Sequence, residues 1–239
     1  MHKAFTHTNK KLIKTAKALG VPTTHVVGFN MPSGWTCPGA NECKAKADRI
    51  TGKVTPGKKA QFRCYMASIE CLSKSLRNQA WNNFEAVKGK SSSEIATWLH
   101  QTLLKEYPNV KYVRPHPGGD FFSQYYFDGW LKLAKIMRPD LQFWAYTKSI
   151  PFWIQRLDII PDNFHLVASM GGKYDDLALQ HNLRKAIVVT EPHPELPTYA
   201  TEADSEIAML QTTGDFALMI HGTQRKEYMK YEWKLEQGA

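Results

Sequence analysis

The chain has 239 residues, of which 43% are hydrophobic, so it is long enough to bury one large core. It carries 31 Lys and Arg against 22 Asp and Glu, a formal net charge of +9, which permits contact with nucleic acid or another polyanion. No apolar run approaches the roughly 20 residues that span a bilayer, and the basic start lacks the apolar centre of a secretory signal. We therefore expect a single-domain protein, residues 1–239, in a reducing cytosolic setting.

The first third of the chain predicts a helix, a strand and a cysteine-bearing segment. Residues 1–20 are predicted to form a short basic helix, because apolar residues recur near helical spacing and Gly20 follows as a stop signal. Residues 24–30, THVVGFN, are typical of a strand. The segment 33–72 then holds all four cysteines, and helices are predicted over 60–87 and 91–108.

From residue 110 onward, strands and helices alternate. The apolar runs predict strands, which are 110–120 with its Gly-rich end, 141–149, 163–169, 186–192 and 216–222. Helices are predicted between them, at 123–139, 151–160, 173–185 and 205–214. This alternation indicates an α/β fold with a mainly parallel sheet. We predict a partial or distorted (β/α) barrel, and neither a GxGxxG fingerprint nor a Walker A loop supports a doubly wound alternative.

Polar turns follow several of the predicted strands. Ligands bind at the carboxyl ends of parallel strands, because the loops converge there. Six side chains in these turns are therefore expected to line one mouth, and they are Asp120, Lys148, Ser169, Glu191, His193 and His221. For each residue alone, a role as a turn or cap residue is the better interpretation, and only the set as a whole favours a ligand site.

The four cysteines predict a metal site. Cys37 and Cys43 are six positions apart, and Cys64 and Cys71 are seven apart on a predicted helix, so the second pair shares a helix face. A cysteine cluster in a reducing compartment is more often a metal site than a disulfide framework. Ordinary buried thiols are the alternative, above all for Cys71. Sulfur ligands suit zinc or iron, and these wide spacings favour a [4Fe–4S] cluster over a zinc knuckle.

The position of the cysteines, in the loop after the first predicted strand, is similar to that in radical-SAM partial barrels. The turn Gly118-Gly119-Asp120 is similar to the turn that approaches the methionine end of S-adenosylmethionine in those enzymes. That resemblance implies a cofactor site at Gly118, Gly119 and Asp120, with three or four of the cysteines holding the cluster. The usual CxxxCxxC spacing is absent, which counts against conventional radical chemistry.

A second resemblance covers roughly residues 10 to 225. The stretches FNMPSGWTCPGANECKAKAD, FRCYMASIE, HPGGDFFSQYYFDGWLKLA, FWAYTKS and GDFALMIHGTQ resemble the phage protein family named after mycobacteriophage gene product 88. The resemblance implies a phage-encoded protein that works in the host cytoplasm. Cys37, Cys43 and Cys64 stand at its recurrent positions, whereas Cys71 does not.

These observations lead to one main functional hypothesis. It is a phage iron–sulfur protein with one [4Fe–4S] cluster on Cys37, Cys43, Cys64 and Cys71, with radical-SAM-like activity and no assigned catalytic residue. The alternative is a metal-stabilised protein, with zinc in place of the cluster, that binds nucleic acid or a host protein without catalysis. In that case the basic first 65 residues form the contact surface, and Trp35, Phe62 and Tyr65 are available to stack on bases.

Overall fold

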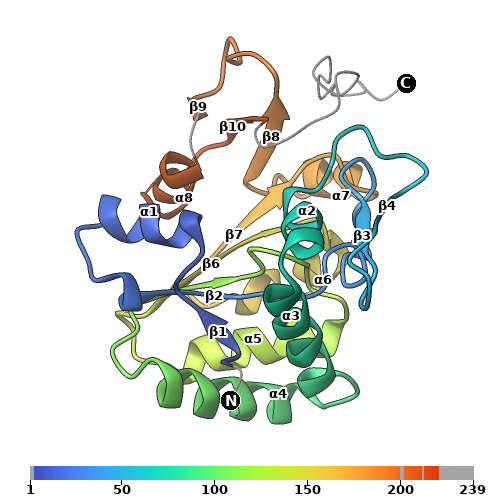
Figure 1. The fold of residues 1–239 in the computed structure, drawn as a ribbon. Helices are drawn as coiled ribbons and strands as arrows, with labels where there is room; N and C mark the ends of the chain where they lie inside the picture. The colour runs from blue at the N-terminus through green and yellow to red at the C-terminus, as the bar shows by residue number, and fades with distance from the viewer. Residues whose placement is uncertain (1–2, 200–201, 212, 221–239) are drawn as a thin grey trace.

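A computed structural model describes residues 3–199, 202–211 and 213–220, and its centre is one eight-stranded sheet (Figure 1). The strands lie in the order β1-β2-β5-β6-β7-β8-β10-β9, and β3 and β4 form a separate antiparallel pair. Their bounds are β1 Phe5–Thr6, β2 Val26–Phe29, β3 Ala45–Ala47, β4 Val54–Pro56, β5 Tyr112–Pro115, β6 Gln142–Thr147, β7 Phe164–Ser169, β8 Lys185–Val189, β9 Thr198–Tyr199 and β10 Phe216–Met219.

The prediction of an α/β fold with mainly parallel strands is confirmed. Strands β2, β5, β6, β7, β8 and β10 are parallel and follow one another in chain order, whereas β1 pairs antiparallel with β2. Within the described residues, β1 and β9 each pair with a single neighbour, so this part of the chain forms an open sheet and not a closed barrel. The cysteine-bearing segment follows β2, the second strand, because the two-residue strand β1 precedes it.

The helices begin where the sequence supplies caps. The Ser91 hydroxyl accepts a hydrogen bond from the Glu94 amide, and the Glu94 carboxylate accepts one from the Ser91 amide, which is a complete capping box for α4. The helix predicted over 60–87 is two helices, because Ser73 has an extended backbone and caps the second one through the Leu76 amide. Helix bounds are α1 Lys10–Ala18, α2 Tyr65–Leu72, α3 Lys74–Val87, α4 Ser92–Glu106, α5 Gln124–Ile136, α6 Ile150–Ile154, α7 Asp175–Gln180 and α8 Glu202–Gln211, with short 3₁₀ turns at Thr23–His25 and Leu157–Ile159.

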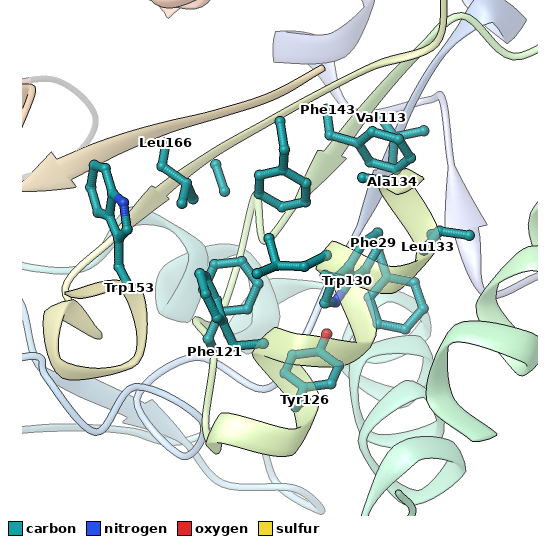
Figure 2. Packing of buried hydrophobic residues seen from close by; sticks show 14 of the residues in the cluster. Phe29, Val113, Phe121, Tyr126, Trp130, Leu133, Ala134, Phe143, Trp153 and Leu166 are labelled. Atoms are coloured by element: carbon teal, nitrogen blue, oxygen red, sulfur yellow. The ribbon is translucent and has the colours of Figure 1, made fainter. Parts of the chain in front are cut away.

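Both faces of the sheet are buried, each in its own cluster. On one face, Trp130 of α5 lies among aromatic rings, 5.5 Å from Phe29 and 6.4 Å from Tyr126 between ring centroids (Figure 2). On the other face, α1 and α8 contact each other and pack on alternate strand residues such as Trp144 and Val167. Burial on both sides explains why these strands read as continuous apolar runs.

Candidate functional site

A cavity of about 220 Å³ opens at the carboxyl ends of the parallel strands. The loops after β5 and β6 and the end of β7 supply one wall, and β8 and β10 supply an apolar wall that includes Val188 and Leu218. The segment between β2 and α2 and the facing helices α1 and α8 complete it. The polar lining consists of Lys11, Cys37, Cys43, Arg63, Cys64, Tyr65, Arg114, His116, Asp120, Tyr146, Lys148, Ser169 and Glu206.

Three of the four cysteines line this cavity as protonated thiols. Cys64 stands at the N-cap of α2, and the Cys37 sulfur accepts a hydrogen bond from the Gly34 amide at 3.3 Å. Burial is the main cause that raises the pKa of Cys37, Cys43 and Cys64, the last to about 11. Cys71, in contrast, is exposed on α2 and does not belong to the lining.

A lysine and an ion pair form the wall on the side of α1 and α8. Lys11 is buried, and its Nζ lies 3.3 Å from the centroid of the Tyr65 ring. Desolvation, followed by the positive charge of Arg114, holds the pKa of Lys11 well below its ordinary value. Arg114 itself forms an ion pair with Glu206, which also accepts a hydrogen bond from the Trp144 indole at 3.1 Å.

Asp120 and Lys148 organise the opposite side of the cavity. The Asp120 carboxylate accepts hydrogen bonds from the Thr147 hydroxyl at 2.6 Å and from the Lys148 amide at 2.9 Å. The Lys148 ammonium donates to Ser169 and to the carbonyl of Met170. Burial nevertheless raises the pKa of Asp120 to about 6. The loops after β5, β6 and β7 are thereby tied together at the floor of the cavity.

The raised pKa of Asp120 predicts a pH dependence of stability. Its ordinary value is 3.8, so the folded protein holds this proton more tightly than the unfolded chain does. The group contributes stability that is fully present below pH 3.8 and is lost as the pH rises through about 6. Urea unfolding of Asp120→Asn between pH 4 and pH 7 should show a smaller loss of stability with rising pH than the wild type.

An exposed carboxylate supplies the control for this measurement. Hydrogen bonds from Thr51 lower the pKa of Asp48, so its contribution runs in the opposite direction. In Asp48→Asn, the decrease in stability between pH 4 and pH 7 that Asp120 causes should therefore remain. An unchanged pH profile in Asp120→Asn would contradict the assignment.

His116 is held in a strained conformation at the end of β5. Its φ is +61°, in the left-handed region that a residue with a side chain seldom adopts, and it lies between two prolines. Nε2 lies 2.9 Å from the Tyr126 hydroxyl, and Nδ1 is buried with no hydrogen-bond partner among the described residues. Burial lowers the pKa of His116 to about 3, so the ring is neutral. Strain of this kind concentrates at functional sites.

The turn Gly118-Gly119-Asp120 lines the cavity, as expected for residues at a ligand site. Each glycine also has a packing reason: a Cβ on Gly118 would lie 3.0 Å from Met66, and one on Gly119 would lie 2.5 Å from Met31. A role in binding S-adenosylmethionine stays a prediction.

The prediction of an iron–sulfur protein is wrong. Among the described residues, no group of three or more His, Cys, Asp or Glu side chains is placed to hold a metal ion. This finding overturns the hypothesis of an iron–sulfur protein, and it gives the zinc alternative no support. The spacing of cysteines along the chain is the same whether they ligate a metal or only line one cavity. Among the described residues, Cys37, Cys43 and Cys64 line one cavity without forming a ligand set.

The remaining predicted residues divide between the cavity and other places. Asp120, Lys148 and Ser169 line the cavity, whereas Glu191 and His193 lie outside its lining, and His221 lies outside the described residues. The sequence interpretation missed Lys11, Arg114, His116 and Glu206. Lys11 had a usable signal, because it lies beside Leu12 on the apolar side of a helix. His116 had another, since prolines flank it.

The fold and the cavity together define an α/β protein with a cavity at the carboxyl edge of a parallel sheet, where ligands bind in proteins of this class. Residues 3–234 match the family model described as Gene product 88, and the chain belongs to that family. The Gene 88 protein of Mycobacterium phage L5 is 25% identical over 169 residues, which is 64% of each chain. That of Mycobacterium phage D29 is 25% identical over 171 residues, 64% of this chain and 63% of the relative.

The chain thus spans slightly less than two thirds of the length of these curated relatives. No solved structure matches the chain. The family resemblance seen in the sequence is confirmed. In the described part of the chain, every helix is too short or too polar to cross a membrane.

Proposed function

We propose that the protein binds a small organic anion in the thiol-lined cavity. The balance of charge in the cavity wall carries this proposal. Among the described lining residues, the cations Arg63, Arg114 and Lys148 face the carboxylates Asp120 and Glu206, so the cations exceed the carboxylates by one. Lys11 adds a fourth basic group, which can be neutral or charged because its pKa is lowered.

Both carboxylates are already engaged by protein groups. Asp120 accepts from Thr147 and Lys148, and Glu206 is paired with Arg114 and bonded to Trp144. The three cavity thiols hold their protons and add no negative charge. An anionic ligand would restore the balance in a place of low dielectric, where such an interaction is strong. The apolar wall at Val188 and Leu218 would cover its carbon skeleton.

A partial-barrel curvature of the sheet would support binding at this cavity, because it would bring the carboxyl ends of successive strands around a single opening. S-adenosylmethionine, whose methionine end carries a carboxylate, is one candidate ligand for the wall at Gly118, Gly119 and Asp120. The phage relatives favour the host cytoplasm as the place of action. Nucleic acid and a host protein stay predictions as partners.

The cysteines provide an internal readout for binding. The intact protein is treated with a maleimide, and labelling of each cysteine is followed by mass spectrometry in the presence of glycolate, citrate, inorganic phosphate or S-adenosylmethionine. A bound ligand should slow labelling of Cys37, Cys43 and Cys64 and leave Cys71 unchanged, because only Cys71 lies outside the cavity. Unchanged rates at all four cysteines with every ligand would contradict the proposal.

A charge variant links the protection to the cavity. Arg63→Gln removes one of the lining cations and should weaken the protection of the three thiols. Arg138→Gln is the matched control, because Arg138 is exposed, pairs with Asp140 and does not line the cavity. Equal protection in both variants would indicate that the ligand binds elsewhere.

A further inference from the structure

Lys11 differs from the other lysines of its helix. It is 8% exposed and faces the cavity, whereas Lys14 and Lys17 on the same helix are exposed. Its ammonium position lies over the Tyr65 ring and near the guanidinium of Arg114. A buried amine beside a second cation loses its proton more easily than a surface amine, and this is how lysines that attack carbonyl groups are activated.

The cavity also has two chemically distinct ends. Lys11, Tyr65 and Arg114 form one end, and Cys64 directly precedes Tyr65 there. Lys148 and Asp120 form the other, where their charges act on Cys43. A bifunctional ligand could therefore place different groups at the two ends. The Lys148 end suits an anionic group, and the Lys11 end suits a group that reacts with an amine.

We propose that Lys11 captures a small oxo acid covalently, as an imine between its Nζ and the carbonyl carbon of the ligand. This inference rests on the proposed anion-binding function and specifies its ligand as a carbonyl compound that carries a carboxylate. Lys11 is on this view the reacting group. Lys148 attracts the acid by its positive charge, since its three N–H donors are bonded to Ser169 and Met170.

The chemistry needs no metal, oxidant or reductant. The lone pair of Nζ attacks the carbonyl carbon, the C=O electron pair moves to oxygen, and one N–H proton is transferred to that oxygen. The hydroxyl then leaves as water with a proton taken from solvent, while the nitrogen lone pair forms the C=N bond. The resulting iminium returns one proton to solvent, so one water is released for each imine formed.

Reductive trapping tests this directly. The full-length protein is incubated at pH 7 with glyoxylate and sodium cyanoborohydride, and the carboxymethyl group left on each lysine is located by peptide mass spectrometry. Lys11 should be labelled faster than Lys14, because it lines the cavity that holds the acid and a lowered pKa leaves more of its amine neutral. Labelling of Lys11 no faster than that of Lys14 would overturn the proposal.

Two controls separate the imine from binding alone. Lys11→Arg should lose the preferred label and keep its circular dichroism spectrum, whereas Lys14→Arg should keep the label. Glycolate resembles glyoxylate but lacks the carbonyl group, so it should slow thiol labelling without being trapped. If glycolate protects the cavity thiols and Lys11 is not trapped by glyoxylate, the imine is wrong while anion binding stands. If neither occurs, both proposals fail.

Discussion

Glu206→Gln should destabilise the protein by about 3–5 kcal/mol, because it leaves the buried charge of Arg114 without its partner. Both side chains are almost completely buried, at 7% and 1% exposure. Glutamine keeps the size of the side chain and an oxygen that can accept from Trp144, so the change isolates the lost charge. The loss is a large part of the 5–15 kcal/mol that typically stabilises a folded protein. Urea unfolding measures it.

A surface ion pair of the same chemistry is the control. Arg49 and Glu85 lie 3.0 Å apart with half-exposed side chains, so Glu85→Gln should cost less than about 1 kcal/mol. In the double variant Arg114→Met, Glu206→Gln, neither charge remains, and much of the lost stability should return. Equal losses in Glu206→Gln and Glu85→Gln would show that the buried pair does not stabilise this wall of the cavity.

Gly119→Ala should cost about 2–5 kcal/mol, from two separate causes. The φ of Gly119 is +85°, and an L-residue in the left-handed region loses about 1–2 kcal/mol. The new Cβ would also lie 2.5 Å from the Met31 Cβ and 2.7 Å from the Thr36 hydroxyl, and such overpacking costs about 1–3 kcal/mol. Because the turn lines the cavity, maleimide labelling of Cys37 and Cys64 should also become faster.

Gly89 allows the two causes to be separated. It also has a positive φ, +73°, but a Cβ there would meet nothing within 4 Å. Gly89→Ala should therefore show the conformational cost alone, measured by the same urea unfolding. If Gly119→Ala were no more destabilising than Gly89→Ala, the close packing of the turn on Met31 would be wrong.

Much of the fold could be predicted from the sequence, because the central strands are buried on both faces. The apolar runs at 141–149 and 163–169 contain β6 and β7, and the turn residues around them mark their ends. Strands β1 and β9 have two residues each, too few for any periodic pattern to appear. The sequence analysis missed the helix break at Ser73 because the helical spacing of apolar residues continues across it. Only the extended backbone of Ser73 and its hydrogen bond from the Leu76 amide show where the second helix begins.

The site was less accessible to sequence analysis. The sequence predicted that the polar side chains of Asp120, Lys148 and Ser169 lie close together, because a parallel sheet brings the carboxyl ends of its strands to one edge. The interpretation of the cysteines was wrong because their spacing in the sequence does not show whether the sulfur atoms come close enough together to bind a metal. Arg114 and Glu206 could not be paired, because 92 positions separate them and neither stands in a motif.

The wall formed by α1 and α8 has a consequence for how the protein is made. The Thr15 hydroxyl reaches Glu206 across 191 positions of sequence, so these helices meet only after nearly all of the described chain has been synthesised. Contacts of such long range form late and slowly in folding. The parallel strands β2, β5 and β6 can pair during translation, whereas Arg114 gains its counter-charge only when α8 leaves the ribosome. The apolar wall of the cavity is complete only when β10 follows.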